Sequence, residues 1–181
     1  NSPRRKIGKK GDFYTSAHVS HIFGKTLARQ IIEMADYLGW IDLVILEYGG
    51  GEGHLAKDII EAIKEVRPAE FRKITYYLCE KSTAHREIQK EKLKEFSSQI
   101  EWISGAEEIN DGQGFKGVVF SNELVDAFPV HRIKFSKGKL NEIYVGYADG
   151  FFEVIGGLSK PQLKDYFSYL EFQLEEDQEC E

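Results

Sequence analysis

Glycine and acidic residues in the middle of the chain have the types and spacing needed to bind a nucleotide-like ligand. Glu47 ends an apolar run, and the glycines Gly49, Gly51 and Gly53 follow at every second position. Glycine adopts positive φ values and carries no Cβ, so such a turn lets a ligand approach the backbone. A helical pattern begins directly after the turn, and the start of a helix presents unpaired N–H groups. The pattern predicts a binding site for a nucleotide phosphate, a dinucleotide or S-adenosylmethionine.

A second acidic residue, Glu80, lies 27 residues after Gly53, at the end of the next apolar run. A carboxylate there can accept hydrogen bonds from both ribose hydroxyls of an adenosine ligand. Nicotinamide-binding proteins carry an acidic residue at a similar place, so Glu80 alone does not identify the ligand. A dinucleotide site expects G-x-G-x-x-G, whereas His54 and Leu55 follow the last glycine here. No Gly-Lys-Ser/Thr follows either, which excludes a phosphate P-loop.

A third polar group, Asn122, Glu123 and Asp126, follows another apolar run. Paired carboxylates can hold the planar guanidinium group of an arginine. Asn122 could orient either a substrate or a cofactor. If the ligand is S-adenosylmethionine, the reaction is methyl transfer from a sulfonium. This in-line displacement needs a positioned nucleophile more than a strong acid or base. The alternatives are a solvated surface role for Glu123 and a capping or ion-pair role for Asp126.

Alternating helical and strand patterns must position these residues. Apolar spacings of three and four predict a first helix over 17–38, with Ser16 as its cap and Gly39 at its end. Apolar runs predict strands at 43–48, 74–79, 100–103 and 117–121. Helical patterns at 53–66 and 83–96, the latter capped by Ser82, lie between the first three strands, and a short helical turn is expected at 123–127.

This alternation predicts an α/β fold with a mainly parallel, Rossmann-like sheet that helices cover on both faces. In such sheets a ligand binds beyond the carboxyl ends of the strands, which is where the three polar groups fall. An antiparallel hairpin is predicted near 131–147, with its turn at 136–139. Residues 160–181 are predicted to form a helix that ends in an acidic tail.

Three segments together resemble the MidA-like family of class I S-adenosylmethionine-dependent methyltransferases. They are GDFYTSAHVSHIFGKTLARQI (11–31), LEYGGGEGHLAKDI (46–59) and SNELVDAFPVHR (121–132), and the similarity covers roughly residues 3–147. The resemblance implies the Rossmann-like class I methyltransferase fold, S-adenosylmethionine as cofactor and methylation of an arginine in a partner protein. Two departures are Ala17, where the family usually has proline, and Tyr48-Gly49, where it often has Leu-Gly. Family members are also much longer.

The resemblance also implies a role for individual residues. The three glycines would flank the methionine part of the cofactor, Glu47 would bind its amino group and Glu80 its ribose. Trp102 or Ile103 would line the adenine pocket, although Trp102 is equally suited to the core. Thr15, with Asp12 and Ser16, would lie in a segment that folds over the cofactor, or would cap the first helix. The catalytic residues would be Asn122, Glu123 and Asp126.

Three divisions of the chain follow. Residues 1–16 are predicted to form an N-terminal loop segment over the cofactor site, and residues 17–147 the Rossmann-like methyltransferase core. Residues 148–181 are predicted to form a helical accessory segment, with the fold incomplete relative to the family. The chain has no initiator Met, so we expect it to be part of a longer protein.

The composition limits the kinds of molecule that this protein is expected to bind. A net charge of −6 and an isoelectric point near 5.5 argue against nucleic-acid binding. Two cysteines form neither a disulfide framework nor a zinc motif, and the histidine spacing predicts no metal site. No apolar stretch reaches the ~20 residues of a membrane span. We expect a protein substrate and a cytoplasmic location, or the mitochondrial matrix in a eukaryote; a homodimer is one assembly to consider.

Two other functions are compatible with these patterns. One is a non-catalytic binding or assembly protein that retains a methyltransferase-like fold. The other is a nicotinamide-dependent oxidoreductase, which the missing third dinucleotide glycine disfavours. S-adenosylmethionine-dependent arginine methylation remains the leading hypothesis.

Overall fold

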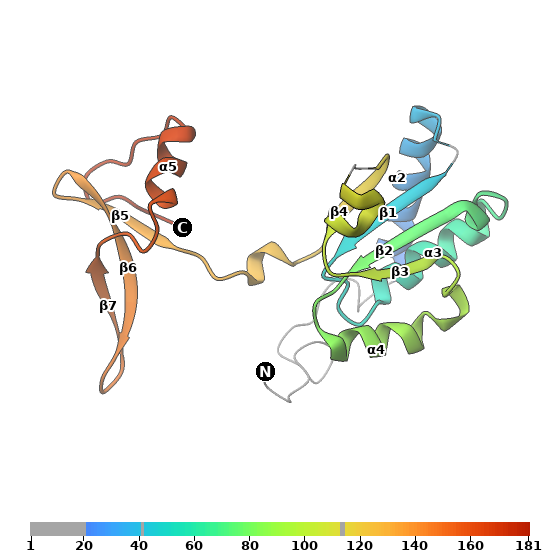
Figure 1. Cartoon of the computed structure of the whole chain (residues 1–181), viewed down its shortest axis with the longest axis horizontal. Helices are drawn as coiled ribbons and strands as arrows, with labels where there is room; N and C mark the ends of the chain where they lie inside the picture. Colours follow the sequence, from blue (N-terminus) through green and yellow to red (C-terminus); the bar gives the residue numbers. More distant parts are fainter. Residues whose placement is uncertain (1–20, 41, 113–114) are drawn as a thin grey trace. The chain divides into compact units, whose positions relative to one another are not determined.

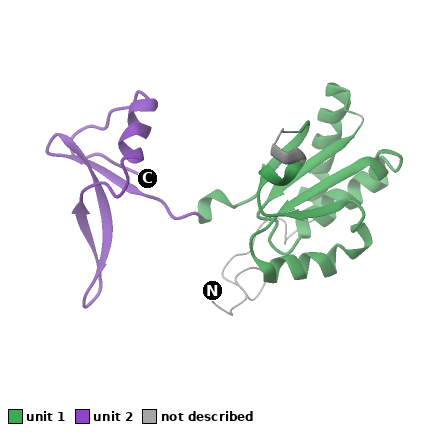
Figure 2. Cartoon of the chain, viewed as in Figure 1, with its two compact units in different colours: residues 1–127 green, residues 128–181 purple. Residues whose placement is uncertain are grey.

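A computed structural model describes residues 21–40, 42–112 and 115–181 of the chain (Figure 1). The chain divides into two compact units, residues 1–127 and residues 128–181 (Figure 2). Each unit has a sheet and an apolar core of its own.

The sheet of the first unit is parallel, in the order β3-β2-β1-β4. Its strands have the predicted bounds, which confirms the expectation drawn from the apolar runs: β1 (Leu43–Tyr48), β2 (Ile74–Cys79), β3 (Ile100–Ile103) and β4 (Gly117–Ser121). Strands β1 and β2 are apolar at successive positions because side chains on both of their faces are covered.

The described residues of this unit form three α-helices: α2 (His21–Leu38), α3 (His54–Val66) and α4 (Thr83–Lys92). Gly39 follows α2 with φ 65°, the left-handed value that ends many helices. Ser82 caps α4, as predicted, by accepting a hydrogen bond from the backbone of His85. The predicted helix over 83–96 is α-helical only to Lys92, and a 3-10 turn, η2 (Lys94–Phe96), replaces its last part.

The core forms on both faces of the parallel sheet. On one face, alternate strand residues such as Ile45 and Tyr76 pack with Ile31 of α2 and Ile59 of α3. On the other face, Leu46, Cys79 and Ile103 pack with Ile109 of η3 (Ala106–Gly112). Among the described residues, α-helices cover the first face, and the 3-10 helix η3 covers part of the second, where Val119 of β4 is exposed.

The second unit contains an antiparallel sheet in the order β7-β6-β5-β8. Its elements are β5 (Arg132–Ser136), β6 (Lys139–Tyr147), β7 (Phe151–Gly156), α5 (Gln162–Tyr169) and β8 (Glu179–Cys180). The hairpin predicted near 131–147 is confirmed as β5 and β6. Its turn places Lys137 and Gly138 at φ 55° and 72°, the left-handed pair typical of a tight hairpin.

The predicted helix over 160–181 is wrong beyond Tyr169. Glu171 adopts φ 52°, and the backbone N–H groups of Glu171 and Phe172 bond back to Ser168 and Phe167, which closes the helix. The chain then turns back, and β8 pairs with β5. The packing of Leu174, which is buried beside Phe167, favours this return over a longer helix. Strand β7 was not predicted, and its residues are exposed on both faces rather than alternating.

We expect the packing of α2 on α3 to contribute strongly to the stability of the first unit. Ile31 is fully buried, so Ile31→Ala should lower the free energy of unfolding by about 2–5 kcal/mol. Urea unfolding can be followed by tryptophan fluorescence, because Trp40 and Trp102 both lie in this unit. Tyr37→Ala is the control, since Tyr37 is 90% exposed on the same helix. Equal effects of the two substitutions would contradict the assignment.

Candidate functional site

The glycine turn after β1 depends on backbone conformations that favour glycine. Gly49, Gly51 and Gly53 have φ values of 68°, 54° and 81°, all in the left-handed region. A hydrogen bond from Gly53 N to Gly50 O (2.8 Å) closes the turn. Another, from Gly49 N to Cys79 O (3.0 Å), attaches its start to β2. The turn leads straight into α3, so its backbone and the start of the helix can face a common ligand.

Neighbouring side chains pack closely against this turn. A Cβ on Gly49 would lie 2.7 Å from Leu124 Cδ1, and a Cβ on Gly50 would lie 2.7 Å from Leu78 Cδ2. Leu124 belongs to the segment after β4 that carries the predicted catalytic residues. The structure therefore brings the glycine turn and that segment into contact, although they are far apart in sequence.

Glu47 lies buried beneath the glycine turn, with 2% of its surface exposed. Tyr76 Oη donates a hydrogen bond to Glu47 Oε2 (2.7 Å). Burial raises the pKa of Glu47 to about 7; the Tyr76 hydrogen bond lowers it, and the negative charge of Glu80 raises it. Burial also raises the pKa of Tyr76 well above its ordinary value, so the phenol remains a donor. A cationic ligand group near Glu47 would favour the ionised carboxylate.

Glu80 follows β2 and is held by the start of α4. Its Oε1 accepts a hydrogen bond from Ser82 N (2.8 Å), and its Oε2 lies 3.5 Å from His85 Nδ1. The side chain is largely buried. Each carboxylate oxygen can accept more than one hydrogen bond, so Glu80 retains capacity for a ligand hydroxyl.

Arg86 joins the ends of β2 and β3. It donates to Glu80 O (2.6 Å), Ile103 O (2.7 Å) and Ser104 Oγ (3.0 Å). The sequence patterns did not predict a role for Arg86. The sequence feature that could have indicated Arg86 is its position four residues after the Ser82 cap, on the first turns of α4.

Trp102 lies in β3, with its indole against the helix-covered face of the sheet. Its Nε1 donates to Gln89 Oε1 (3.0 Å), and Gln89 Nε2 donates to Gly51 O (2.8 Å). The sequence patterns did not predict a role for Gln89 either. Gln89 could have been identified as a polar residue on the same helical face as Leu93 and Phe96, which are both buried.

The segment after β4 exposes two carboxylates. Glu123 is exposed and adopts φ 47°, an uncommon value for a residue other than glycine. Asp126 is exposed in the 3-10 turn η4 (Val125–Ala127), and Asn122 is half-buried. Backbone strain of this kind is concentrated at functional sites, so Glu123 is suited to facing a ligand.

The predicted site residues thus fall at one edge of the parallel sheet. Glu47, Glu80 and Asn122 follow or end β1, β2 and β4, and the glycine turn lies beside them. Trp102 lies one residue before the end of β3. Thr15, Asp12 and Ser16 lie outside the described residues. The individual roles of all these residues remain predictions.

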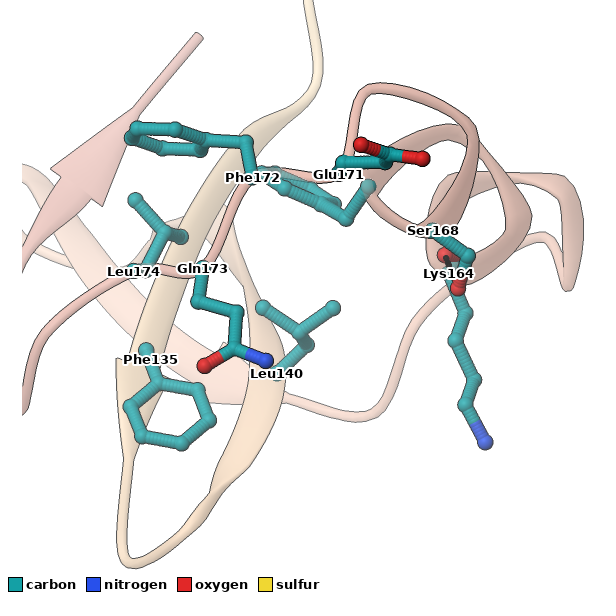
Figure 3. A pocket seen from close by; sticks show the side chains of 9 residues that line it. Phe135, Leu140, Lys164, Ser168, Glu171, Phe172, Gln173 and Leu174 are labelled. Atoms are coloured by element: carbon teal, nitrogen blue, oxygen red, sulfur yellow. Dashed lines mark hydrogen bonds between the residues drawn. The ribbon is translucent and has the colours of Figure 1, made fainter.

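Three other features were considered as possible functional sites: a metal site, a membrane-spanning helix and a cavity in the second unit. The described part of the chain contains no group of three His, Cys, Asp or Glu residues that could hold a metal ion. No described helix combines the length and apolar character needed to span a membrane. The second unit has a cavity of about 550 Å³ (Figure 3), which contains none of the predicted site residues. It is lined by Phe135, Leu140, Lys164, Phe167, Ser168, Glu171, Phe172, Gln173 and Leu174.

Comparison with known proteins gives consistent results. Residues 26–181 match the profile of a family described as "putative S-adenosyl-L-methionine-dependent methyltransferase". The chain is 26% identical over 161 residues to the mitochondrial protein arginine methyltransferase NDUFAF7 homolog of Caenorhabditis elegans, which covers 78% of this chain and 36% of the relative. It is 26% identical over 165 residues to the Drosophila melanogaster homolog, covering 80% and 37%. The chain therefore spans little more than a third of these relatives.

A solved structure shares the fold. It is a protein of Burkholderia thailandensis bound to S-adenosyl-homocysteine, with a TM-score of 0.72 and 24% sequence identity. The similarity covers 91% of this chain and 42% of that chain. The Rossmann-like fold predicted from the sequence is thereby confirmed.

The raised pKa of Glu47 makes stability depend on pH. The folded protein keeps this proton up to about pH 7, whereas the unfolded chain releases it near 4.5, so the free energy of unfolding falls as pH rises through that window. Glu47→Gln cannot ionise. Relative to this variant, the wild type should lose about 3 kcal/mol of stability across the window, as measured by urea unfolding.

Tyr76→Phe is the matched variant. Its loss of the hydrogen bond that lowers the folded-state pKa of Glu47 should extend the window to higher pH, while the lower end, set by the unfolded chain, stays the same. A wild-type stability that changes with pH in parallel with Glu47→Gln would contradict the assignment.

Proposed function

This chain belongs to the family of S-adenosyl-L-methionine-dependent methyltransferases that its residues 26–181 match, and from this premise we propose that it binds S-adenosylmethionine and methylates an arginine of a partner protein. The curated relatives, named as protein arginine methyltransferases, support the arginine acceptor. The S-adenosyl-homocysteine in the Burkholderia protein of the same fold supports the cofactor.

The observation that carries the proposal is the grouping of two buried carboxylates and a left-handed glycine turn at one sheet edge. Glu80, held by Ser82 N, would accept hydrogen bonds from the ribose hydroxyls. Glu47 would bind the amino group of the methionine part from beneath the turn. The absence of side chains on the glycines would leave room for the methionine part to lie along the backbone. Trp102 would line part of the pocket that binds the adenine ring of the cofactor.

The acceptor would be held by the segment after β4. S-Adenosylmethionine supplies a sulfonium-bound methyl group, and the protein must place a nucleophile in line with it. Glu123 and Asp126 would bind the guanidinium of the substrate arginine through charge-assisted hydrogen bonds and restrict its orientation. Asn122, less exposed than either, would orient the bound groups. Because Leu124 of this segment contacts the glycine turn, acceptor and cofactor would bind next to each other.

The remaining properties follow from the same proposal. We infer a protein substrate rather than a nucleic acid, in line with the acidic net charge of −6. The relatives are named as mitochondrial proteins, which supports our proposal of the mitochondrial matrix if this chain comes from a eukaryote. For any other source we propose the cytoplasm. A homodimer is the assembly that we propose to test first, by sedimentation at several concentrations.

Cofactor binding can be tested by calorimetry with S-adenosylmethionine. The wild type should bind, and Glu80→Ala should weaken binding by about 10–100-fold, because the lost hydrogen bonds involve a charged acceptor. Glu87→Ala, an exposed change on the neighbouring helix α4, is the control and should leave affinity unchanged. Absence of binding to a folded wild type would contradict the proposal, and binding of NADH instead would favour an oxidoreductase.

Binding of the substrate arginine by Glu123 and Asp126 can be tested by a methyl-transfer assay. Glu123→Gln and Asp126→Asn should each reduce transfer of labelled methyl groups to protein by about 10-fold or more, while S-adenosylmethionine affinity stays within about twofold of wild type. Glu107→Gln, an exposed carboxylate elsewhere in the same unit, is the control. Cofactor binding without any labelled protein product would favour a non-catalytic assembly protein.

A further inference from the structure

Gln89 occupies an unusual position for an amide side chain. Of the residues of α4, all of which the structure describes, it is the buried one, with 0% of its surface exposed. Leu93 and Phe96, on the same face, pack in the apolar core. A side chain at such a position is ordinarily apolar, and an amide is stable there only when its polar atoms are hydrogen-bonded.

Both ends of the Gln89 amide have partners. Nε2 donates to Gly51 O (2.8 Å), and Oε1 accepts from Trp102 Nε1 (3.0 Å). A carbonyl can only accept and an indole N–H can only donate, so the orientation of the amide is determined by its neighbours. One side chain thus links the glycine turn after β1 to helix α4 and to strand β3.

An external hydrogen bond of this kind can help to order the glycine turn. Gly49, Gly51 and Gly53 are all left-handed, and glycine loses more conformational freedom on ordering than any other residue. The carbonyl and the N–H of a trans peptide unit point in opposite directions. When Gln89 holds Gly51 O, it therefore also fixes the direction of the N–H on the far side of that peptide.

Packing reinforces the hydrogen bond. A Cβ on Gly53 would lie 3.3 Å from Gln89 Cγ and 3.2 Å from Leu93 Cδ1, so α4 lies directly against the turn. Trp102 is held from the other side, with its indole N–H engaged by Gln89. Its ring is then available to a ligand only through its apolar surface.

We propose that Gln89 is a positioning residue that fixes the Gly51–Glu52 peptide and the Trp102 ring in the arrangement that binds the adenosine and methionine parts of the cofactor. The inference rests on the proposed function. It predicts that loss of Gln89 weakens cofactor binding while the methyl-transfer rate at saturating cofactor changes little.

The test compares three variants of the full chain. Gln89→Met has a similar volume and removes both hydrogen bonds. In its ionised form, Gln89→Glu keeps the acceptor for Trp102 but faces the Gly51 carbonyl with an oxygen that cannot donate. Burial favours the neutral acid, which can donate, so this variant is measured at a pH at which its carboxyl group is ionised. Glu91→Met, exposed on the same helix, is the control. Affinity for S-adenosyl-homocysteine is measured by calorimetry well below the unfolding temperature of each variant.

Both Gln89 variants should bind S-adenosyl-homocysteine about tenfold more weakly, whereas Glu91→Met should bind like the wild type. The Michaelis constant for S-adenosylmethionine should rise by the same factor, with kcat within about twofold. A residue needed only for folding would lower the unfolding temperature and leave both constants unchanged.

A double-mutant cycle tests the link to Trp102. The effects of Gln89→Met and Trp102→Phe on affinity should be non-additive, because each removes the same hydrogen bond. In a Trp40→Phe background Trp102 is the sole tryptophan of the chain, and Gln89→Met should shift its emission. Full additivity, or an unchanged affinity of folded Gln89→Met, would overturn the proposal.

The outcomes separate the two proposals. Failure of the folded wild type to bind S-adenosyl-homocysteine overturns the proposed function and this role with it. Wild-type binding with unchanged affinity in the Gln89 variants overturns only the positioning role. If Gln89→Met does not fold, Gln89→Glu, which retains one of the two bonds, decides between these results.

Discussion

Strand β1 pairs in parallel with β2 on one side and β4 on the other, in a register that aligns Tyr48 with both Cys79 and Ser121. The chain must leave all three strands at the same level, so the residues that follow them gather at one edge of the sheet. The glycine turn, Glu80 and the Asn122–Asp126 segment owe their proximity to this pairing. Each group alone is a common surface feature, and the register makes them one site.

This arrangement carries an energetic cost within the core. Glu47 and Tyr76 lie among apolar side chains, and their mutual hydrogen bond compensates only part of the loss of water. The raised pKa of Glu47 reflects the remainder of that cost. A carboxylate that is poorly solvated in the free protein is well suited to a cationic partner, because the partner restores the interactions that water would have made.

Much of the parallel sheet could be predicted from the sequence. Apolar runs such as 43–48 and 74–79 correspond to strands whose two faces are covered, and turn residues such as Gly39 and Ser82 mark the ends of the helices. The second unit was predicted less well. Strand β7 is exposed on both faces and therefore has no periodic pattern, and α5 ends at a left-handed Glu171, where no glycine or proline marks the stop.

Within the site, the sequence indicated the residues that stand at strand ends but missed those that support them. Arg86 and Gln89 act through backbone carbonyls and an indole N–H of distant segments, and such partners become visible only in three dimensions. The sole trace of Gln89 is a polar residue at a helix position that faces the core. Such an exception to helical periodicity is informative because burial of an unpaired amide is costly.

The contact between Gly49 and Leu124 limits which substitutions these two positions can accept during evolution. The Leu124 side chain fills the volume that any Cβ at position 49 would need, so the two positions share one space although 75 residues separate them. A side chain at position 49 requires Leu124 to move aside or to be replaced by a smaller residue, and the left-handed backbone at 49 opposes the exchange in either case. The proposed cofactor-binding and acceptor-binding segments are therefore coupled at this contact, and a substitution in one affects the packing of the other.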